Sequence, residues 1–342
     1  MTEALQAQWL LAPIFGIFTG MLIAWSGLTP VNLIVRMARG DYRLLWPTIS
    51  IILICLIGLQ ILCATGLLDG NASEHAKPVF YWTGMIGGSF IFGAGLAVAR
   101  TDIMTAGLKI VSEHVTSITA MTIIILTSVS AERGILSFVV DLMLDSAVYD
   151  MSAFGLKAFT ISGILQYVFK LPIQHIALFS AAIVGGFGLL LALMMGDMWR
   201  RPAMLFTAIV VGAALPLLWG ITVVPESLPY MLIEPATAFL SLAGLEVGPV
   251  TPLIGFIFAF YLGGVIMTSV PSIHPLPQTA NPSRLIFGCI MMGLGAVLAG
   301  GDMIAHSMIG IPTLAVTSIV CMPAMIISAT ITSRLLDGAI PS

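Results

Sequence analysis

Two aspartates occupy equivalent positions in two similar segments of the chain. Residues 93–102 read GAGLAVARTD and residues 293–302 read GLGAVLAGGD, each at the end of an apolar run. The residues that recur in register are Gly93, Gly95, Ala99 and Asp102 in the first copy and Gly293, Gly295, Ala299 and Asp302 in the second. An ionisable side chain at membrane depth costs about 2.5–3.5 kcal/mol on insertion scales and is a functional candidate by default. Asp102 and Asp302 are therefore predicted to bind a proton, a cation or a polar substrate.

The glycines and the aspartates of these segments have different explanations. Small residues let membrane helices approach closely, which accounts for the four repeated glycines without any site. A close helix contact does not account for an acid at the same place in both copies. The structural alternative for each aspartate is a cap on the following helix at the membrane interface. Both interpretations put Asp102 and Asp302 at helix N-termini, so they differ in depth rather than in local chemistry.

Other polar residues lie close to the two aspartates in sequence. His306 follows Asp302 by one helical turn, so a helix would place both on one face. There His306 could share a proton with Asp302 or orient a substrate. Arg100 and Lys109 flank Asp102. Arg100 either neutralises the carboxylate at depth or anchors the chain in the inner leaflet.

Glycines also interrupt the second segment, because Gly300 and Gly301 directly precede Asp302. Duplicated halves with glycine-interrupted hydrophobic segments are a sequence pointer to a transporter binding site near the bilayer midplane. At a helix break, unpaired backbone N–H groups and the helix dipole can hold an ion or a polar substrate. The repeat thus predicts a path for a small molecule or ion.

The elements that position these residues are predicted to be membrane helices. Of the 342 residues, 58% are hydrophobic and 8% are charged, against about 25% charged in soluble domains. Residues 1–342 are therefore expected to form a single all-α membrane domain without a soluble head. Runs of about 20 apolar residues predict nine spans, near residues 10–28, 45–67, 80–99, 115–130, 174–196, 203–223, 251–270, 284–299 and 310–332.

The repeat divides this domain into two related halves. The first half is expected at about 1–135, a connecting region at about 136–200 and the second half at about 201–342. Two stretches are ambiguous, since residues 135–170 turn polar and charged residues and a proline interrupt residues 228–246. Each is either a crossing or an interfacial helix.

Lysine and arginine positions predict the orientation. The segment after the first span carries Arg36, Arg39 and Arg43, whereas residues 1–9 carry no base, so the N-terminus should lie outside. Arg334 places the C-terminus in the cytoplasm by the same rule. An outside start and an inside end require an odd number of crossings, which agrees with nine.

Several classes of function find no support in the sequence. The net charge of −3 comes from scattered residues, without a basic stripe for nucleic acid. The four cysteines lie in apolar runs without metal-ligand spacing, as small packing residues do. Catalytic motifs such as Gly-x-Ser-x-Gly and His-Glu-x-x-His are missing, so neither an enzyme nor a cofactor is expected. The expected partners are the lipid bilayer and a small-molecule or ion substrate.

The second segment continues with His306 and with the stretch Gly-Ile-Pro-Thr-Leu at 310–314. This pattern, from Gly293 to Ser318, resembles the YeeE/YedE family of bacterial inner-membrane proteins. The family pattern is Gly-x-Gly-x-x-Leu-Ala-Gly-Gly-Cys, then a His and a similar Gly-Ile-Pro-Thr-Leu stretch. The match at 93–102 is weaker, and the order of spans agrees over most of the chain. The family includes thiosulfate transporters and proteins linked to sulfur or selenium uptake.

The resemblance implies an hourglass of about nine helices in two related halves, with short broken helices meeting at the centre. Family members are thought to pass thiosulfate between cysteine thiols, one in each Gly-Gly-Cys element and one after the first helix. Here Asp302 and Asp102 stand at two of these positions, Arg100 and Thr101 replace the first Gly-Gly pair, and residues 25–30 hold no cysteine. Two ionised aspartates would repel a dianion unless they are protonated or neutralised by Arg100 and His306.

Two functions stay open at this point. The first is a transporter or permease for a small solute, by resemblance a sulfur-containing compound such as thiosulfate, with Asp102 and Asp302 at a central constriction. The second is a degenerate family member that acts as a membrane subunit or anchor for a partner protein, which the lost cysteines motivate. Asp141 and Asp145, one helical turn apart, are candidates for a partner surface, although the solvated face of an amphipathic helix also explains them.

Overall fold

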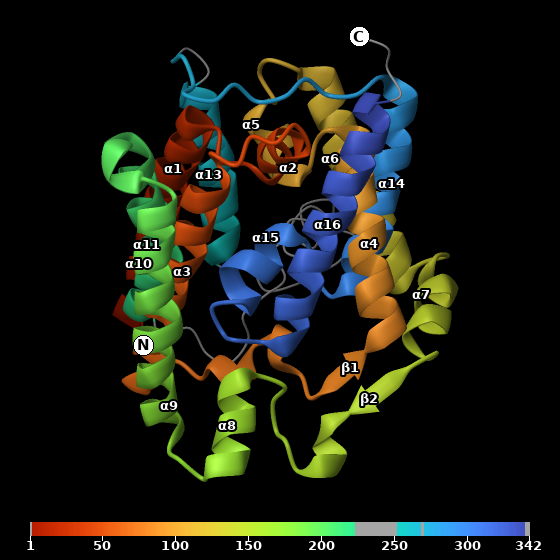
Figure 1. Cartoon of the computed structure of the whole chain (residues 1–342). Helices are drawn as coiled ribbons and strands as arrows, with labels where there is room; N and C mark the ends of the chain where they lie inside the picture. The colour runs from red at the N-terminus through yellow and green to blue at the C-terminus, as the bar shows by residue number, and fades with distance from the viewer. Residues whose placement is uncertain (1, 223–251, 268–269, 339–342) are drawn as a thin grey trace.

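The computed structural model describes residues 2–222, 252–267 and 270–338 of the chain. Two groups of long helices stand on either side of shorter ones (Figure 1). The long helices are α1 (Thr2–Ser26), α3 (Leu45–Ala64), α4 (Trp82–Ala99), α6 (His114–Arg133), α11 (Pro202–Thr222), α13 (Pro252–Ile266), α14 (Pro282–Ala299) and α16 (Val316–Gly338). A further long helical run is α9 (Ile173–Ser180), the π-helix η4 (Ala181–Phe187) and α10 (Gly188–Met195).

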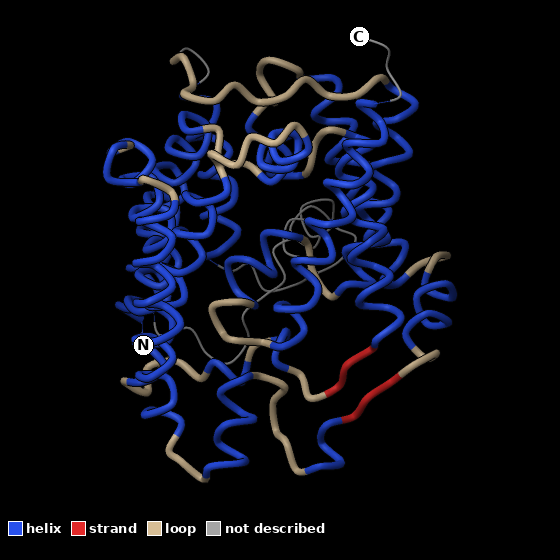
Figure 2. The backbone as a smooth tube through the Cα atoms, viewed as in Figure 1, coloured by secondary structure: helices blue, strands red, loops and turns tan. Residues whose placement is uncertain are grey.

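The shorter elements lie between and beside these helices. The short helices are α2 (Pro30–Ala38), α5 (Ile103–Leu108), α7 (Ser137–Leu144), α8 (Ile161–Phe169), α15 (Met303–Ala305) and the π-helix η7 (His306–Gly310). The 3-10 turns are η1 (Gly70–Ala72), η2 (Glu74–Ala76), η3 (Met151–Phe154) and η5 (Met198–Arg200). Helix dominates the described chain, with one pair of short strands (Figure 2).

The composition of the helices identifies the chain as a multi-pass integral membrane protein. Within the described residues, eight helices are long and apolar enough to cross a membrane. Large apolar side chains on them face outward, with Leu126, Phe179 and Phe206 each more than half exposed. Water would disfavour such a surface, whereas lipid tails accept it. The expected all-α membrane fold is confirmed.

The structure gives a different outcome for the expected span at residues 251–270 and for each of the two ambiguous stretches. Residues 251–270 contain α13, which is apolar but shorter than the eight helices of membrane-spanning length. Residues 228–246 lie outside the described residues. Residues 135–170 form α7, η3, α8 and the strand β2 (Val148–Asp150), without a crossing helix. β2 pairs antiparallel with β1 (Val79–Tyr81), with Phe80 opposite Tyr149.

Antiparallel helices α4 and α14 pack together through glycines at the centre of one group. A Cβ on Gly95 would lie 2.6 Å from the carbonyl oxygen of Gly288, and a Cβ on Gly295 would lie 2.5 Å from the backbone nitrogen of Phe92. The offset that relates Asp102 to Asp302 also relates Gly88 to Gly288 and Gly95 to Gly295, and all four of these glycines are at the contact. Only glycine permits this approach of two backbones.

The outer faces of the same two helices repeat the arrangement. A Cβ on Gly93 of α4 would lie 2.2 Å from the Met325 carbonyl oxygen of α16, and a Cβ on Gly293 of α14 would lie 2.8 Å from the Ile124 carbonyl oxygen of α6. We propose that the α4–α14 contact marks the axis between two inverted halves of the chain. The repeated glycines thus have a packing role, and their place along a substrate path stays a prediction.

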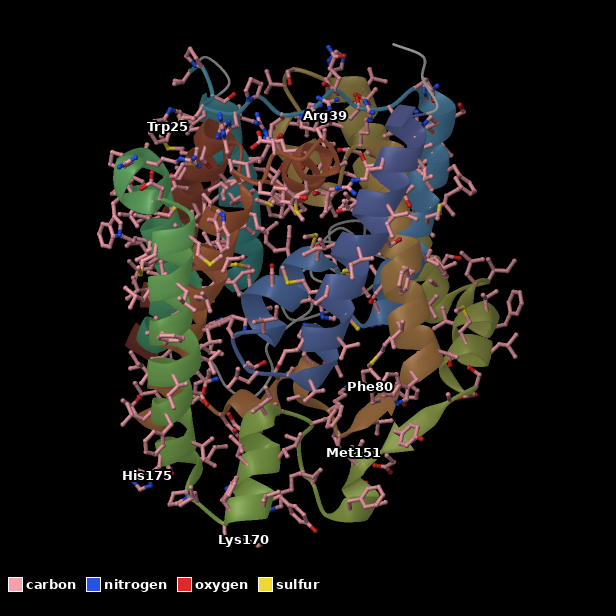
Figure 3. The ribbon with its side chains drawn as sticks, in the orientation of Figure 1. Trp25, Arg39, Phe80, Met151, Lys170 and His175 are labelled. Atoms are coloured by element: carbon pink, nitrogen blue, oxygen red, sulfur yellow. The ribbon has the colours of Figure 1, made fainter. Side chains whose placement is uncertain are left out.

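The molecule has two distinct ends. Trp25 and Arg39 lie at one end, where Arg334 of α16 donates to the Ala38 carbonyl, and Lys170 and His175 lie at the opposite end (Figure 3). A loop at residues 270–281 crosses the first end, where the Ile273 N–H donates to the Trp25 carbonyl and the Ala280 N–H to the Ala99 carbonyl. The outside N-terminus, cytoplasmic C-terminus and bacterial inner membrane stay predictions.

Candidate functional site

Helix α4 ends in a turn that places Asp102 at the start of α5. Arg100 has the left-handed conformation (φ 53°) that commonly ends a helix, and its N–H donates to the Leu96 carbonyl. Asp102 is the N-cap of α5, where its Oδ1 accepts the Thr105 N–H at 2.6 Å. Its side chain is buried, with 4% of the residue exposed.

Helix α14 ends in the same way and places Asp302 at the start of α15. Gly300 (φ 75°) and Gly301 (φ 150°) form the turn, and Asp302 Oδ1 accepts the Ala305 N–H at 2.7 Å. Asp302 is 3% exposed. The capping geometry expected from the sequence is therefore present at both breaks. Both carboxyl groups are also buried in the protein, and their place on a substrate path stays a prediction.

Asp102 contacts a second helix end as well. The backbone N–H of Val31, in the first turn of α2, interacts with the Asp102 carboxyl group. The Thr29 side chain caps the same helix by accepting the Asn32 N–H. The first N–H groups of a helix have no partner within it, so Asp102 and Thr29 share the N-terminus of α2. α2, α5 and α15 lie between the two groups of long helices (Figure 1).

Asp302 borders a cavity of about 140 Å³ between the two groups of long helices. The polar lining residues are Thr19, Thr29, Thr48, Tyr261, Asp302 and Ser307. Four methionines also line it, namely Met104, Met303, Met308 and Met322, and the remaining lining is apolar apart from backbone atoms. Asp102 does not line this cavity. Among the described residues, Asp302 is its one charged lining side chain.

Tyr261 of α13 connects the cavity to both breaks. Its hydroxyl donates to the Ile103 carbonyl at 3.4 Å, and its ring fills the space that a Cβ on Gly107 of α5 would need. The carboxyl groups of Asp102 and Asp302 both interact electrostatically with its hydroxyl. No sequence motif marks Tyr261, because its proximity to these residues arises only from the packing of α13 on α5.

His306 lies in η7, directly after the second break. It is fully buried, and its Nδ1 is 2.8 Å from the Ser318 hydroxyl. The ring of His75 lies close to it, with 4.9 Å between the ring centroids. The imidazole pairs with Ser318 through Nδ1, and proton sharing between His306 and Asp302 stays a prediction. The one-turn spacing still holds along the backbone, where the His306 N–H donates to the Asp302 carbonyl.

His75 also lies at this site, although no sequence motif marks it. It lies in η2, far from His306 in sequence, and its carbonyl accepts the Thr317 hydroxyl at 2.7 Å. A Cβ on Gly301 would lie 3.0 Å from His75 Cε1, so the glycine makes room for the ring. A histidine in a polar loop carries no signal of such a contact.

Lys109 supports the first break from outside the cavity. Its ammonium group donates to the Pro277 carbonyl at 2.8 Å and pairs with Glu113 at 2.6 Å, which fixes the loop 270–281 over α5. Partial burial raises the pKa of Glu113, but hydrogen bonds from Lys109 and Thr279 outweigh it and lower that pKa below its ordinary value. Lys109 is thus engaged with the loop, and neutralisation of Asp102 by Arg100 stays a prediction.

Two cysteines contact backbone carbonyls near the second break, and one of them, Cys321, lies 4.0 Å from the Ala299 carbonyl oxygen. All four are buried and free, and Cys55 donates to the Met308 carbonyl at 3.3 Å. Within the described residues, no group of three or more His, Cys, Asp or Glu side chains could hold a metal ion.

A family model described as sulphur transport matches residues 33–331, which include both breaks and most of the long helices. No curated protein matches the chain.

Proposed function

The chain belongs to the sulphur transport family, and from this premise we propose that it carries a small sulfur-containing solute such as thiosulfate across the membrane past Asp302. The family supports a membrane transporter for sulfur compounds. The identity of the solute and the roles of the two aspartates are the parts that we add. The observation that carries them is the cavity beside Asp302, bordered by α2 and by the second helix break.

The chemistry of the cavity suits a sulfur compound that is handled without thiols. Methionine thioethers are soft and polarizable, so they contact sulfur atoms favourably. A protonated Asp302 could donate a hydrogen bond to a solute oxygen, and Thr29 and Ser307 could add hydroxyl donors. An ionised Asp302 would repel a dianion in surroundings of low dielectric constant. We therefore propose that a proton accompanies an anionic solute at this position.

Asp102 acts on the same path in a different way. It caps α5 and interacts with the N-terminus of α2, and the first residues of α2 line the cavity. Asp102 is thus a positioning residue that sets the shape of the site. Asn can accept the same N–H groups but has no negative charge and no titratable proton, so Asp→Asn separates capping from charge.

The experiment is uptake of radiolabelled thiosulfate into proteoliposomes. Asp302→Asn should abolish uptake, whereas Asp102→Asn should keep most of it, because asparagine can still cap α5. Asp102→Ala removes the cap and should reduce uptake about tenfold by disturbing α2. Asp141→Asn, on the exposed face of α7, is the matched control and should transport like the wild type. A folded wild type without thiosulfate uptake would remove this solute from the proposal.

The alternative function, a membrane subunit or anchor for a partner protein, predicts a packed centre. The cavity beside Asp302 favours transport over this alternative. Equal uptake by the wild type and Asp302→Asn would reverse that preference.

A further inference from the structure

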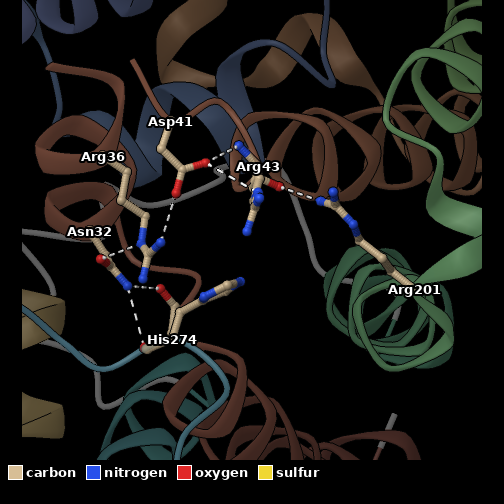
Figure 4. Close-up of polar contacts among 7 residues, drawn as sticks. Asn32, Arg36, Asp41, Arg43, Arg201 and His274 are labelled. Atoms are coloured by element: carbon tan, nitrogen blue, oxygen red, sulfur yellow. Dashed lines mark hydrogen bonds and ion pairs between the residues drawn. The ribbon is translucent and has the colours of Figure 1, made fainter. Parts of the chain in front are cut away.

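A cluster of basic residues lies at the end of the molecule where the loop 270–281 crosses it. Arg36 belongs to α2, Arg43 to the loop before α3, and Arg201 stands directly before α11. His274 is in the crossing loop. These residues come from four separate parts of the chain, and their side chains approach one another (Figure 4).

Hydrogen bonds hold one side of the cluster, around Asn32 and Arg36, in place. Arg36 donates to Asn32 at 3.2 Å and to Asp41 at 2.9 Å, while Asn32 donates to the carbonyls of Gly27 and His274. The crossing loop is therefore tied to the α2 segment beneath it. Arg36 therefore links Asn32 to Asp41 within this hydrogen-bonded group.

Arg43 and Arg201 border an open pocket beside this hydrogen-bonded group. Arg201 donates to the Arg43 carbonyl at 3.4 Å, and Arg43 lies 3.9 Å from Asp41. The pocket has a volume of about 320 Å³ and is lined by Arg43, Arg201, Pro202, Ala203, Met204, Ile273 and His274. In Figure 4 the His274 ring is directed toward Arg43, with the Arg201 guanidinium beyond. Its volume is sufficient for a small oxyanion.

The charge of the cluster is unbalanced. Arg36 and Arg43 share one acidic partner, Asp41, whereas Arg201 donates to a backbone carbonyl. Among these four side chains the positive charges outnumber the negative charge by two. Partial burial lowers the pKa of His274, and Arg36, Arg201 and Arg43 lower it further against the opposing effect of Asp41. The fields of all three arginines therefore converge on the ring that faces the pocket.

We propose that this pocket binds an oxyanion, either a free sulfate-like anion or the phosphate of a lipid headgroup, between Arg43, Arg201 and His274. Guanidinium groups bind such oxygens through parallel hydrogen bonds, and the imidazole N–H supplies a further donor. Ordinary interfacial arginines need no such pocket, whereas these enclose one together with a histidine from a distant loop. The proposal does not rest on transport past Asp302.

The first test is calorimetric titration of the full-length protein with sodium sulfate and sodium thiosulfate, in nanodiscs of phosphatidylcholine alone. Binding that weakens at least about tenfold in Arg43→Gln/Arg201→Gln supports a free anion. Arg200→Gln is the matched control, because Arg200 is exposed, pairs with Asp197 and does not line the pocket. Its affinity should equal that of the wild type.

A second arm distinguishes the lipid source. Phosphatidylglycerol that stays with the wild type in native mass spectrometry, and is lost from Arg43→Gln/Arg201→Gln but not from Arg200→Gln, supports a lipid phosphate in the same site. Binding of neither probe, or binding that the double substitution leaves unchanged, would overturn the proposal.

The pH dependence tests His274 separately. Because a bound anion favours the protonated ring, anion affinity should rise as pH falls, with Arg36, Arg43 and Arg201 charged throughout and Asp41 ionised until more acidic pH. His274→Gln should remove this rise. A wild-type affinity that does not change with pH would overturn the assignment of His274 as a ligand.

Discussion

The two helix breaks share one backbone plan but differ in what surrounds the carboxyl group. Each long helix ends in a left-handed turn, and the aspartate that follows caps a short helix. At the first break Arg100 and Thr101 form the turn, and Asp102 contacts α5 and α2. At the second break two glycines form the turn, and Asp302 borders the cavity.

This difference indicates how the two copies of a duplicated element can have different functions. The caps are equivalent, so capping alone would preserve an acid in either half. Within the described residues, the buried pair of His75 and His306 lies at the second break, and of the two aspartates Asp302 is the one that lines the cavity. There Gly301 also makes room for the His75 ring. We infer that the second break meets the solute and that the first break shapes the site.

Gly301→Ala should have the largest effect on stability. Its φ of 150° disfavours any side chain, and the new Cβ would lie 3.0 Å from His75 Cε1. Backbone strain of this kind costs about 1–3 kcal/mol, so we expect about 3 kcal/mol with the added contact. Thermal unfolding in detergent measures the loss. Thr101→Ser, at the same place in the first break, should be nearly neutral, and an equal loss there would break the comparison.

His306→Ala tests the histidine pair. It leaves the buried Ser318 hydroxyl without its partner, and such a loss costs about 2 kcal/mol. Uptake of thiosulfate should fall together with stability, because the packing next to the Asp302 segment changes. His175→Ala, at an exposed position, is the matched control for unfolding and uptake. Unchanged uptake in His306→Ala would separate the histidines from the path.

Gly300→Ala should cost only about 1 kcal/mol, the strain of a left-handed alanine. The nearest atom to its Cβ would be Met85 Cε at 4.0 Å, so space is available. The equivalent position already holds Arg100 in the same conformation. Uptake should be retained. A large loss of uptake would show that the two turns differ in function although their backbone conformations are alike.

Glu113→Gln should have the smallest effect, below about 1 kcal/mol, because its ion pair with Lys109 is partly exposed. The pKa of Glu113 is lowered in the folded protein, so its contribution is complete above the ordinary value of 4.5 and is lost as pH falls through the lowered pKa. Unfolding midpoints of the wild type and the variant should converge at acidic pH. A difference that persists there would assign the effect to packing.

The sequence was sufficient to predict the long helices and the two caps. Apolar runs of membrane length predict spans without any knowledge of their packing. Asp102 and Asp302 recur in register, so one observation predicted both N-caps. The order Gly300, Gly301, Asp302 carries the turn as well, because glycine is the usual residue in a left-handed helix end.

The surroundings of the aspartates could not be predicted in the same way. His75 meets His306, and Tyr261 meets Ile103, through contacts between residues far apart in sequence. Lys109 follows Asp102 in sequence, and the structure pairs it with the Pro277 carbonyl and with Glu113. Such partners depend on tertiary packing, and no local pattern records them.

The central claim is that the solute meets Asp302 and not Asp102, and cysteine accessibility tests it most directly. Asp302→Cys and Asp102→Cys would be made in a variant whose four native cysteines are serine, with folding of each checked by thermal unfolding. A small thiosulfonate reagent should modify the cysteine at 302 and not the one at 102, and thiosulfate should slow the reaction at 302. Equal modification at both positions, or reaction at 102 alone, would contradict this account.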